Sequence, residues 1–299
     1  MRRIGMVLVM AVVFVALIPA FFQEAKGQEK PVIIVGSKGF TEQTIVGDMV
    51  ALLMENNGFK VDRKIGLGGT VICHEALVRG DINVYVEYTG TGLTAILKKP
   101  AVKDPDEAYQ IVKKEYEEKF KLTWLRPWGF NNTYCIVMRK ADADRLKAKK
   151  VSDLKRYAKD LIFGATIEFL ARPDGVPGLT KFYDLKFKDQ KGMDPGLVYK
   201  AIAENQVDVI SGFATDGRIP AFNLVVLEDD LKFFPPYYAA PVVRDDLLAK
   251  APQVADILNK LAGKISDITM ATLNYTVDGK KQSAEDVARD FLKSQNLIK

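Results

Sequence analysis

The sequence predicts an α/β protein. Short apolar runs rich in β-branched residues alternate with segments whose apolar residues recur at helical spacing, and this alternation favours mostly parallel sheets covered by helices. The composition, 48% hydrophobic and 27% charged, is that of an ordinary globular protein. The length of 299 residues suggests roughly one to three domains. Because the 22 glycines and 13 prolines are scattered, collagen-like and low-complexity chains are excluded.

Local signals predict each element in chain order. The run PVIIVG at 31–36 is short and β-rich, which predicts a buried strand. A helix is expected next, with Thr41 as its N-cap, apolar residues at helical spacing and Gly58 at its end. The remaining predicted elements are a strand at 60–65, a glycine turn and helix at about 71–79, a strand at 82–87, a charged helix at 105–119, strands at 133–139, 161–166, 207–211 and 224–227, and several helices from about 244.

The N-terminus carries a targeting signal. Two arginines precede an apolar run from Met6 to Phe22, and small residues follow it. This pattern predicts a secretory signal peptide at 1–27 with cleavage before Gln28, and therefore a periplasmic or otherwise extracytoplasmic protein. An uncleaved membrane anchor is the alternative, since the run is near the lower limit of roughly 17–25 residues for a spanning helix.

Charge and residue counts exclude several functions. Without residues 1–27, basic residues fall from 43 to 40 and acidic residues from 38 to 37, so the net charge falls from +5 to +3. No basic stripe interleaved with aromatic residues is present, so no nucleic-acid partner is expected. His74 is the only histidine, which disfavours a zinc cluster and most triad hydrolases, and no metal or cofactor is expected. Export permits a disulfide between Cys73 and Cys135, but two buried free thiols are an equal expectation.

Two glycine-bearing turns follow predicted strands. GSKGF at 36–40 stands between a strand and a helix, a context that suits anion binding at a helix N-terminus. Neither this segment nor GLGGT at 66–70 completes a nucleotide-binding motif. We therefore expect ligand groups at strand-to-helix turns, where open α/β sheets bind, but not a nucleotide.

Aromatic residues are found where predicted strands end or begin. These residues are Tyr88 in EYTGT, Tyr134 after Asn131 and Asn132, Phe213 in GFATDGR, and Tyr237 with Tyr238 in FFPPYYAAP. For any one of them, ordinary core packing is the simpler interpretation. Together they predict a ligand site if the fold brings them to one cleft.

The chain resembles the glycine betaine/choline/carnitine substrate-binding proteins of osmoprotectant ABC transporters. The resemblance rests on GSKGFTEQTIVGDMVALLMENNGFKV (36–61), GLGGTVICHEAL (66–77), VYVEYTGTGL (84–93), GFNNTYCIVMR (129–139), ARPDGVPGL (171–179), FATDGRI (213–219) and FPPYYAAPVVR (234–244). It implies a two-lobed periplasmic-binding-protein fold of type II with a ligand cleft between the lobes. The first lobe would comprise 28–137 plus 238–299, and the second 138–237. A membrane permease and its ATPase would be the partners of a monomeric, non-catalytic receptor.

The resemblance also implies an aromatic cage for a quaternary ammonium, formed by Tyr88, Tyr134, Phe213 and Tyr237. Such a cation has no N–H to donate, but ring faces attract it by roughly 0.5–1 kcal/mol when exposed and about 2 or more when desolvated. The family commonly has Tyr where this chain has Phe213, so a hydroxyl is lost. Asn132 stands where some members have an acid, which leaves the cation with less electrostatic support.

The carboxylate of a betaine needs donors, and the resemblance assigns this role to Arg172 in ARPDG. Lys38 and Thr91 are the supporting candidates. A local salt bridge between Arg172 and Asp174 is the alternative for the arginine, and a surface position is the alternative for the lysine.

Two other functions stay open. A receptor for an amino acid or another small polar solute would place an acid such as Glu87 or Asp216 beside the ligand's ammonium. An exported enzyme would use Lys38 or Tyr88 as a base, and turnover would distinguish it.

Overall fold

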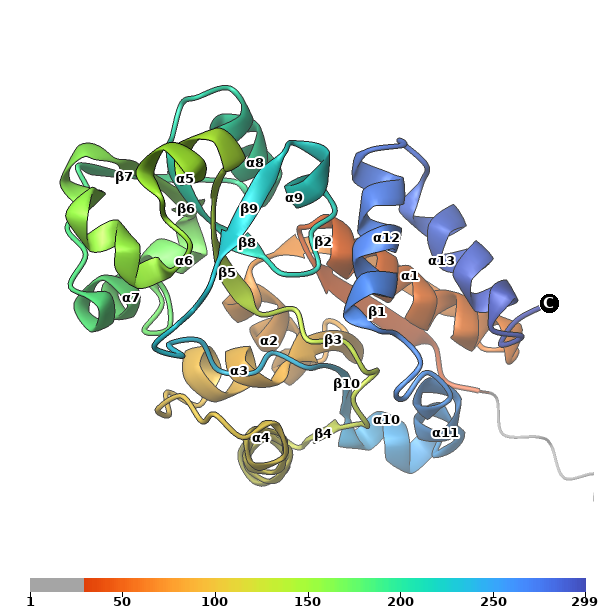
Figure 1. Ribbon diagram of the computed structural model, residues 1–299. Helices are drawn as coiled ribbons and strands as arrows, with labels where there is room; N and C mark the ends of the chain where they lie inside the picture. The colour runs from red at the N-terminus through yellow and green to blue at the C-terminus, as the bar shows by residue number, and fades with distance from the viewer. Residues whose placement is uncertain (1–29) are drawn as a thin grey trace, which may run out of the picture.

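The computed structural model describes residues 30–299, which form two lobes, each built on a five-stranded sheet with helices packed against it (Figure 1). The predicted signal peptide at 1–27 lies outside the described residues. Within residues 30–299, no helix has both the length and the apolar character that a bilayer crossing requires. The predicted α/β class is confirmed.

The first sheet has the strand order β2-β1-β3-β10-β4. Its strands are β1 (Ile33–Lys38), β2 (Val61–Gly68), β3 (Val84–Tyr88), β4 (Leu122–Trp124) and β10 (Ala239–Arg244). Helices of this lobe are α1 (Thr41–Asn56), α2 (Thr70–Arg79), α3 (Thr89–Thr91), η1 (Gly92–Ile96), α4 (Pro105–Phe120), α10 (Asp245–Lys250), α11 (Gln253–Asn259), α12 (Asp267–Asp278) and α13 (Ala284–Ser294). Successive residues of β3 point to opposite faces, so Val84 and Val86 join the core under α1 while Tyr85 joins the core with α4.

The second sheet has the order β7-β6-β8-β5-β9. Its strands are β5 (Tyr134–Arg139), β6 (Ile162–Thr166), β7 (Asp189–Met193), β8 (Val209–Phe213) and β9 (Leu224–Leu227). The helices of this lobe are α5 (Lys140–Leu146), η2 (Val151–Arg156), η3 (Ala158–Asp160), α6 (Ile167–Ala171), α7 (Val176–Tyr183), α8 (Pro195–Ala203) and α9 (Arg218–Ala221).

Each sheet is mixed: four of its five strands run in one direction, in agreement with the predicted mostly parallel sheets, and one strand runs against them. In the first sheet β10 runs antiparallel to β3 and β4, and in the second β5 runs antiparallel to β8 and β9. These antiparallel strands directly follow the two segments that cross between the lobes, 125–133 and 228–238. The crossing segments pair with each other through an antiparallel bridge between Asn131 and Tyr238. The predicted boundary at 137/138 falls inside β5, which pairs wholly within the second sheet.

Most predicted elements are present, and the misses have local causes. The helix expected at Thr41 begins there, but Phe40 is its N-cap and the Thr41 hydroxyl donates to Asp278 at 2.7 Å. Strand β7, DQKGM, is polar and largely exposed, so it shows no apolar run. Strand β10 contains Pro241. Because proline cannot donate a backbone hydrogen bond to a neighbouring strand, this segment is typical of a turn rather than of a strand inside a sheet.

The two cysteines are free and buried, Cys73 in α2 and Cys135 in β5. His74 is also buried and packs edge-on against Tyr116 and Phe120, which is a structural role.

Candidate ligand-binding site

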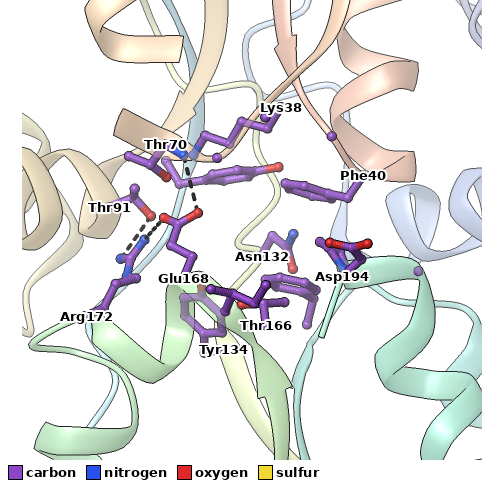
Figure 2. A pocket seen from close by; sticks show the side chains of 18 of the residues that line it. Lys38, Phe40, Thr70, Thr91, Asn132, Tyr134, Thr166, Glu168, Arg172 and Asp194 are labelled. Atoms are coloured by element: carbon purple, nitrogen blue, oxygen red, sulfur yellow. Dashed lines mark hydrogen bonds and ion pairs between the residues drawn. The ribbon is translucent and has the colours of Figure 1, made fainter. Parts of the chain in front are cut away.

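A cavity of about 430 Å³ lies between the two lobes, where strands of both sheets end (Figure 2). Its walls come from the turns after β1, β2 and β3 in the first lobe and after β6, β7 and β8 in the second. All eight residues predicted for the site line it: Lys38, Tyr88, Thr91, Asn132, Tyr134, Arg172, Phe213 and Tyr237. Tyr238, the neighbour of Tyr237, does not line this cavity.

The four predicted rings form one aromatic cluster with a fifth ring. Tyr134 lies between two of them, with its ring centroid 5.1 Å from that of Phe213 and 5.4 Å from that of Tyr237. The backbone brings these rings together, because Tyr134 and Phe213 are register partners at the edge of the second sheet and Tyr88 pairs with Ala239 in the first.

The fifth ring is Phe40, which the sequence interpretation missed. Its centroid lies 5.4 Å from that of Phe213, with the rings nearly parallel, and 6.5 Å from that of Tyr88. Phe40 ends GSKGF, the glycine turn whose context suits anion binding. It is a large apolar residue between a strand and a helix, the same signal that selected the other four rings.

Lys38 lines the cavity and is not a surface lysine, since it is buried. Its Nζ pairs with Glu87 Oε1 at 2.5 Å and lies 5.2 Å from the Tyr88 ring centroid. Glu87 is itself fully buried and does not line the cavity. The two acids suggested for an amino-acid receptor are therefore both paired with protein cations, Glu87 with Lys38 and Asp216 with Arg218.

Arg172 makes the salt bridge that was the alternative to ligand binding. Its Nε and Nη2 donate to the two oxygens of Asp174 at 2.8 and 2.6 Å. Nη2 also reaches Thr91 Oγ1 of the first lobe at 3.3 Å. Tyr237 donates its hydroxyl to Asp174 at 2.5 Å, so the ring and the guanidinium are fixed by one carboxylate. The predicted role of Arg172 toward a ligand carboxylate stays a prediction.

Glu168 is a second residue that the sequence interpretation missed. It lines the cavity, pairs with Arg172 Nη1 at 3.1 Å and accepts from the backbone N–H of Thr70 across the cleft at 3.3 Å (Figure 2). Although burial alone would raise the pKa of Glu168, the charges of Lys38 and Arg172 hold it below its ordinary value. Its spacing of four residues from Arg172 on a helix was the signal available in the sequence.

The comparisons with known proteins identify the family. A family model, the substrate binding domain of ABC-type glycine betaine transport systems, matches residues 31–294. The chain belongs to this family. It is 40% identical over 275 residues to the carnitine transport binding protein OpuCC of Listeria monocytogenes, a match that covers 91% of this chain and 89% of that protein.

Two further similarities support the family assignment. The chain is 40% identical over 271 residues to the ergothioneine transport permease/ergothioneine binding protein EgtU of Helicobacter pylori, covering 90% of this chain and 48% of that longer protein. The crystal structure of a glycine betaine/carnitine/choline ABC transporter protein matches with a TM-score of 0.73 and 38% identity, over 89% of this chain and 100% of that one. The members of this family and these relatives are transport binding proteins. This chain is therefore a binding protein rather than an enzyme.

Proposed function

We propose that the protein captures a quaternary ammonium solute outside the cytoplasmic membrane and delivers it to a membrane permease. The observation that supports this best is the aromatic cluster of Phe40, Tyr88, Tyr134, Phe213 and Tyr237 around one inter-lobe cavity. A trimethylammonium group offers no hydrogen-bond donor, but it is attracted by ring faces and packs well against them. The cavity volume falls within the range of roughly 300–1,000 Å³ typical of small-molecule sites.

The positions of the donors and of the rings give the solute an orientation. Lys38 Nζ lies 5.2 Å from the Tyr88 centroid, and the Arg172 guanidinium lies 5.4 Å from the Tyr134 centroid. Both cations are paired with carboxylates, Lys38 with Glu87 and Arg172 with Asp174 and Glu168. The ligand's ammonium accepts no hydrogen bond, so we place it away from these donors, toward Phe40 and Phe213. A carboxylate on the same solute lies toward Lys38, Arg172 and Thr91, where N–H and O–H donors converge.

Binding would be coupled to closure of the lobes. In this structure Glu168 and Arg172 of the second lobe contact Thr70 and Thr91 of the first. On the opposite side of the cleft Arg218 of α9 lies 3.4 Å from Asp278 of α12. A solute that touches both lobes only when they are closed shifts the population toward this arrangement, which a permease can then recognise.

Ergothioneine is a second candidate solute, because the chain matches the ergothioneine-binding protein as closely as it matches the carnitine-binding protein. It carries the same trimethylammonium and carboxylate groups as the other betaines, with an added ring. The same aromatic cluster and the donors of Lys38, Arg172 and Thr91 would hold it.

Calorimetric titration of the ligand-free mature chain, residues 28–299, tests the proposal. The panel is glycine betaine, choline, carnitine, ergothioneine and arginine. Saturable binding of at least one quaternary amine, with no heat from arginine, is the expected result. Arginine binding alone would instead support an amino-acid receptor, in which Glu168 or the cavity-lining Asp194 contacts the ammonium.

A further inference from the structure

Glu42, in the first turn of α1, is a buried carboxylate directly behind the cavity wall. It is 2% exposed. Its Oε1 accepts from Tyr88 Oη and Asn132 Nδ2, both at 2.7 Å. Its Oε2 accepts from Asn274 Nδ2 of α12 at 2.9 Å and from the hydroxyl of Thr215, which follows β8 in the second lobe. Four donors from separate segments therefore converge on one carboxylate.

None of these four partners is a cation. Within residues 30–299, no lysine or arginine nitrogen lies within 4 Å of Glu42. Burial raises the pKa of Glu42, and the four hydrogen bonds oppose that rise. An ionised carboxylate only accepts hydrogen bonds, and all four partners donate, so the arrangement suits the charged form. Its negative charge has no positive partner among these contacts.

Glu42 fixes the orientation of the Asn132 amide. Because the amide nitrogen donates to the carboxylate, the oxygen must point elsewhere. Asn132 Oδ1 is buried and has no hydrogen-bond partner within the described chain, while the side chain lines the cavity. Figure 2 shows Asn132 among the cavity side chains. A buried acceptor without a partner carries a free-energy cost unless a ligand group approaches it.

Glu42 also fixes Tyr88. The Tyr88 hydroxyl donates to Glu42 and accepts from Gln43 Nε2 at 3.0 Å, so both of its hydrogen-bonding roles are filled by protein. Only the ring is left for a solute. A phenol that donates to a carboxylate gains electron density in its ring, which strengthens the attraction between that ring and a cation.

We propose that Glu42 is a specificity-determining residue, which sets the preference for a positively charged head group. It acts through the cavity wall in three ways: it fixes the Asn132 amide, polarises Tyr88 and supplies the negative charge behind both. It is a positioning residue, since Tyr88 and Asn132 stand between it and the solute. The proposal rests on the proposed function.

The test compares charged solutes with their neutral-headed carbon isosteres. Glycine betaine is paired with 3,3-dimethylbutanoate, and choline with 3,3-dimethylbutan-1-ol, so shape is preserved while the positive charge is removed. Affinities for the wild type, Glu42→Gln and the exposed control Glu75→Gln are measured by calorimetry, with NMR titration for millimolar binders. Gln keeps the size of Glu but removes the charge.

The expected result is that Glu42→Gln weakens the cationic solutes by about tenfold or more, the value of one lost charge contact, and changes the isosteres less than about twofold. The control Glu75→Gln changes neither. Equal losses for cation and isostere would show a purely structural role and overturn the inference, as would unchanged affinity for both. Failure of the wild type to bind any quaternary amine would instead overturn the proposed function.

Tyr88→Phe provides a second variant if Glu42→Gln does not fold. It keeps the ring and removes the hydroxyl that links the ring to Glu42. We expect a selective loss of about twofold to fivefold for the cationic solutes, within the range of an exposed cation–π contact. No change in the ratio of cation to isostere affinity would contradict the coupling between Glu42 and the ring.

Discussion

Tyr134 and Phe213 are register partners across the antiparallel strands β5 and β8, with ring centroids 5.1 Å apart. Tyr134 begins its strand and Phe213 ends the other, so this cross-strand pair occupies the edge of the sheet that faces the cavity. The pair joins two segments that are far apart in the sequence. The pairing of β5 with β8 therefore brings together the two rings that the second sheet contributes to the aromatic cluster.

Replacing Tyr134 with Ala should weaken quaternary-ammonium binding by at least about 1 kcal/mol, within the cation–π range. The ring contacts Phe213 and Tyr237, so its loss also loosens their positions. Calorimetry measures the affinity and circular dichroism checks the fold. Phe222→Ala, which removes a ring that is 44% exposed, serves as the control and should bind normally. Unchanged binding by Tyr134→Ala would eliminate the aromatic cage.

Arg172→Ala should harm glycine betaine far more than choline, because only glycine betaine has a carboxylate. We expect a difference of about tenfold or more between the two losses, since a charge-assisted hydrogen bond is worth about 1.5–3 kcal/mol. Calorimetric titration with both solutes measures the difference. Because Asp174 and Glu168 also lose a partner, part of the loss will be common to both ligands. Equal losses of affinity for the two solutes would show that Arg172 only links the two lobes and does not contact the ligand carboxylate.

The contact between Arg218 and Asp278 should favour the closed arrangement. These side chains are 14% and 15% exposed and belong to different lobes. Asp278→Asn should lower the affinity for every solute by a similar factor of about twofold to fivefold, as expected for a partly exposed ion pair. Small-angle scattering should show a larger radius of gyration at subsaturating solute. Asp246→Asn, whose pair with Arg244 lies within the first lobe, is the matched control. A ligand-selective effect would contradict a role in closure.

Asp48 should make stability depend on pH. Burial raises its pKa to about 6, although Arg63 opposes the rise. Since this folded-state pKa lies above the unfolded value of about 3.9, the folded state binds the proton more tightly and this group's contribution to stability falls as pH rises from about 4 past 6. Asp48→Asn should therefore raise the free energy of unfolding by on the order of 1 kcal/mol at pH 7.5, allowing for partial solvent screening.

The gain from Asp48→Asn should disappear near pH 4, where wild-type Asp48 is protonated in the folded state. Urea denaturation at several pH values measures both effects, with the exposed Asp62→Asn as control. A variant that is less stable than the wild type at pH 7.5 would show that the contact with Arg63 outweighs the cost of burial.

The two cysteines should not react with a thiol reagent in the folded protein at pH 8. Burial raises the pKa of Cys73 to about 12, so its reactive thiolate is scarce, and Cys135 is buried as well. Denaturation should expose two reactive thiols. If the denatured, unreduced protein showed none, the cysteines would be paired in a disulfide.

The sequence indicated the strands and the aromatic positions because both depend on local signals. A strand such as β9 is a short apolar run, and its predicted bounds of 224–227 match the structure. The ring positions follow from the ends of such strands, where a parallel sheet leaves side chains at one edge. The mixed sheets were not predictable in the same way, since the direction of β5 and β10 depends on where the chain crosses between lobes.

Local sequence signals predicted the α/β class, most element positions and the aromatic residues at strand ends, because hydrophobic periodicity and turn residues act over a few neighbours. Which side chains meet depends on how distant segments pack. Glu42 and Thr215 are separated by 173 residues, and Arg172 reaches Thr91 over 81. The packing of the two lobes determines these partners. A charge buried in a low-dielectric interior is costly unless it is hydrogen-bonded or paired, so it interacts with the donors that the fold places beside it, however distant they are in the sequence.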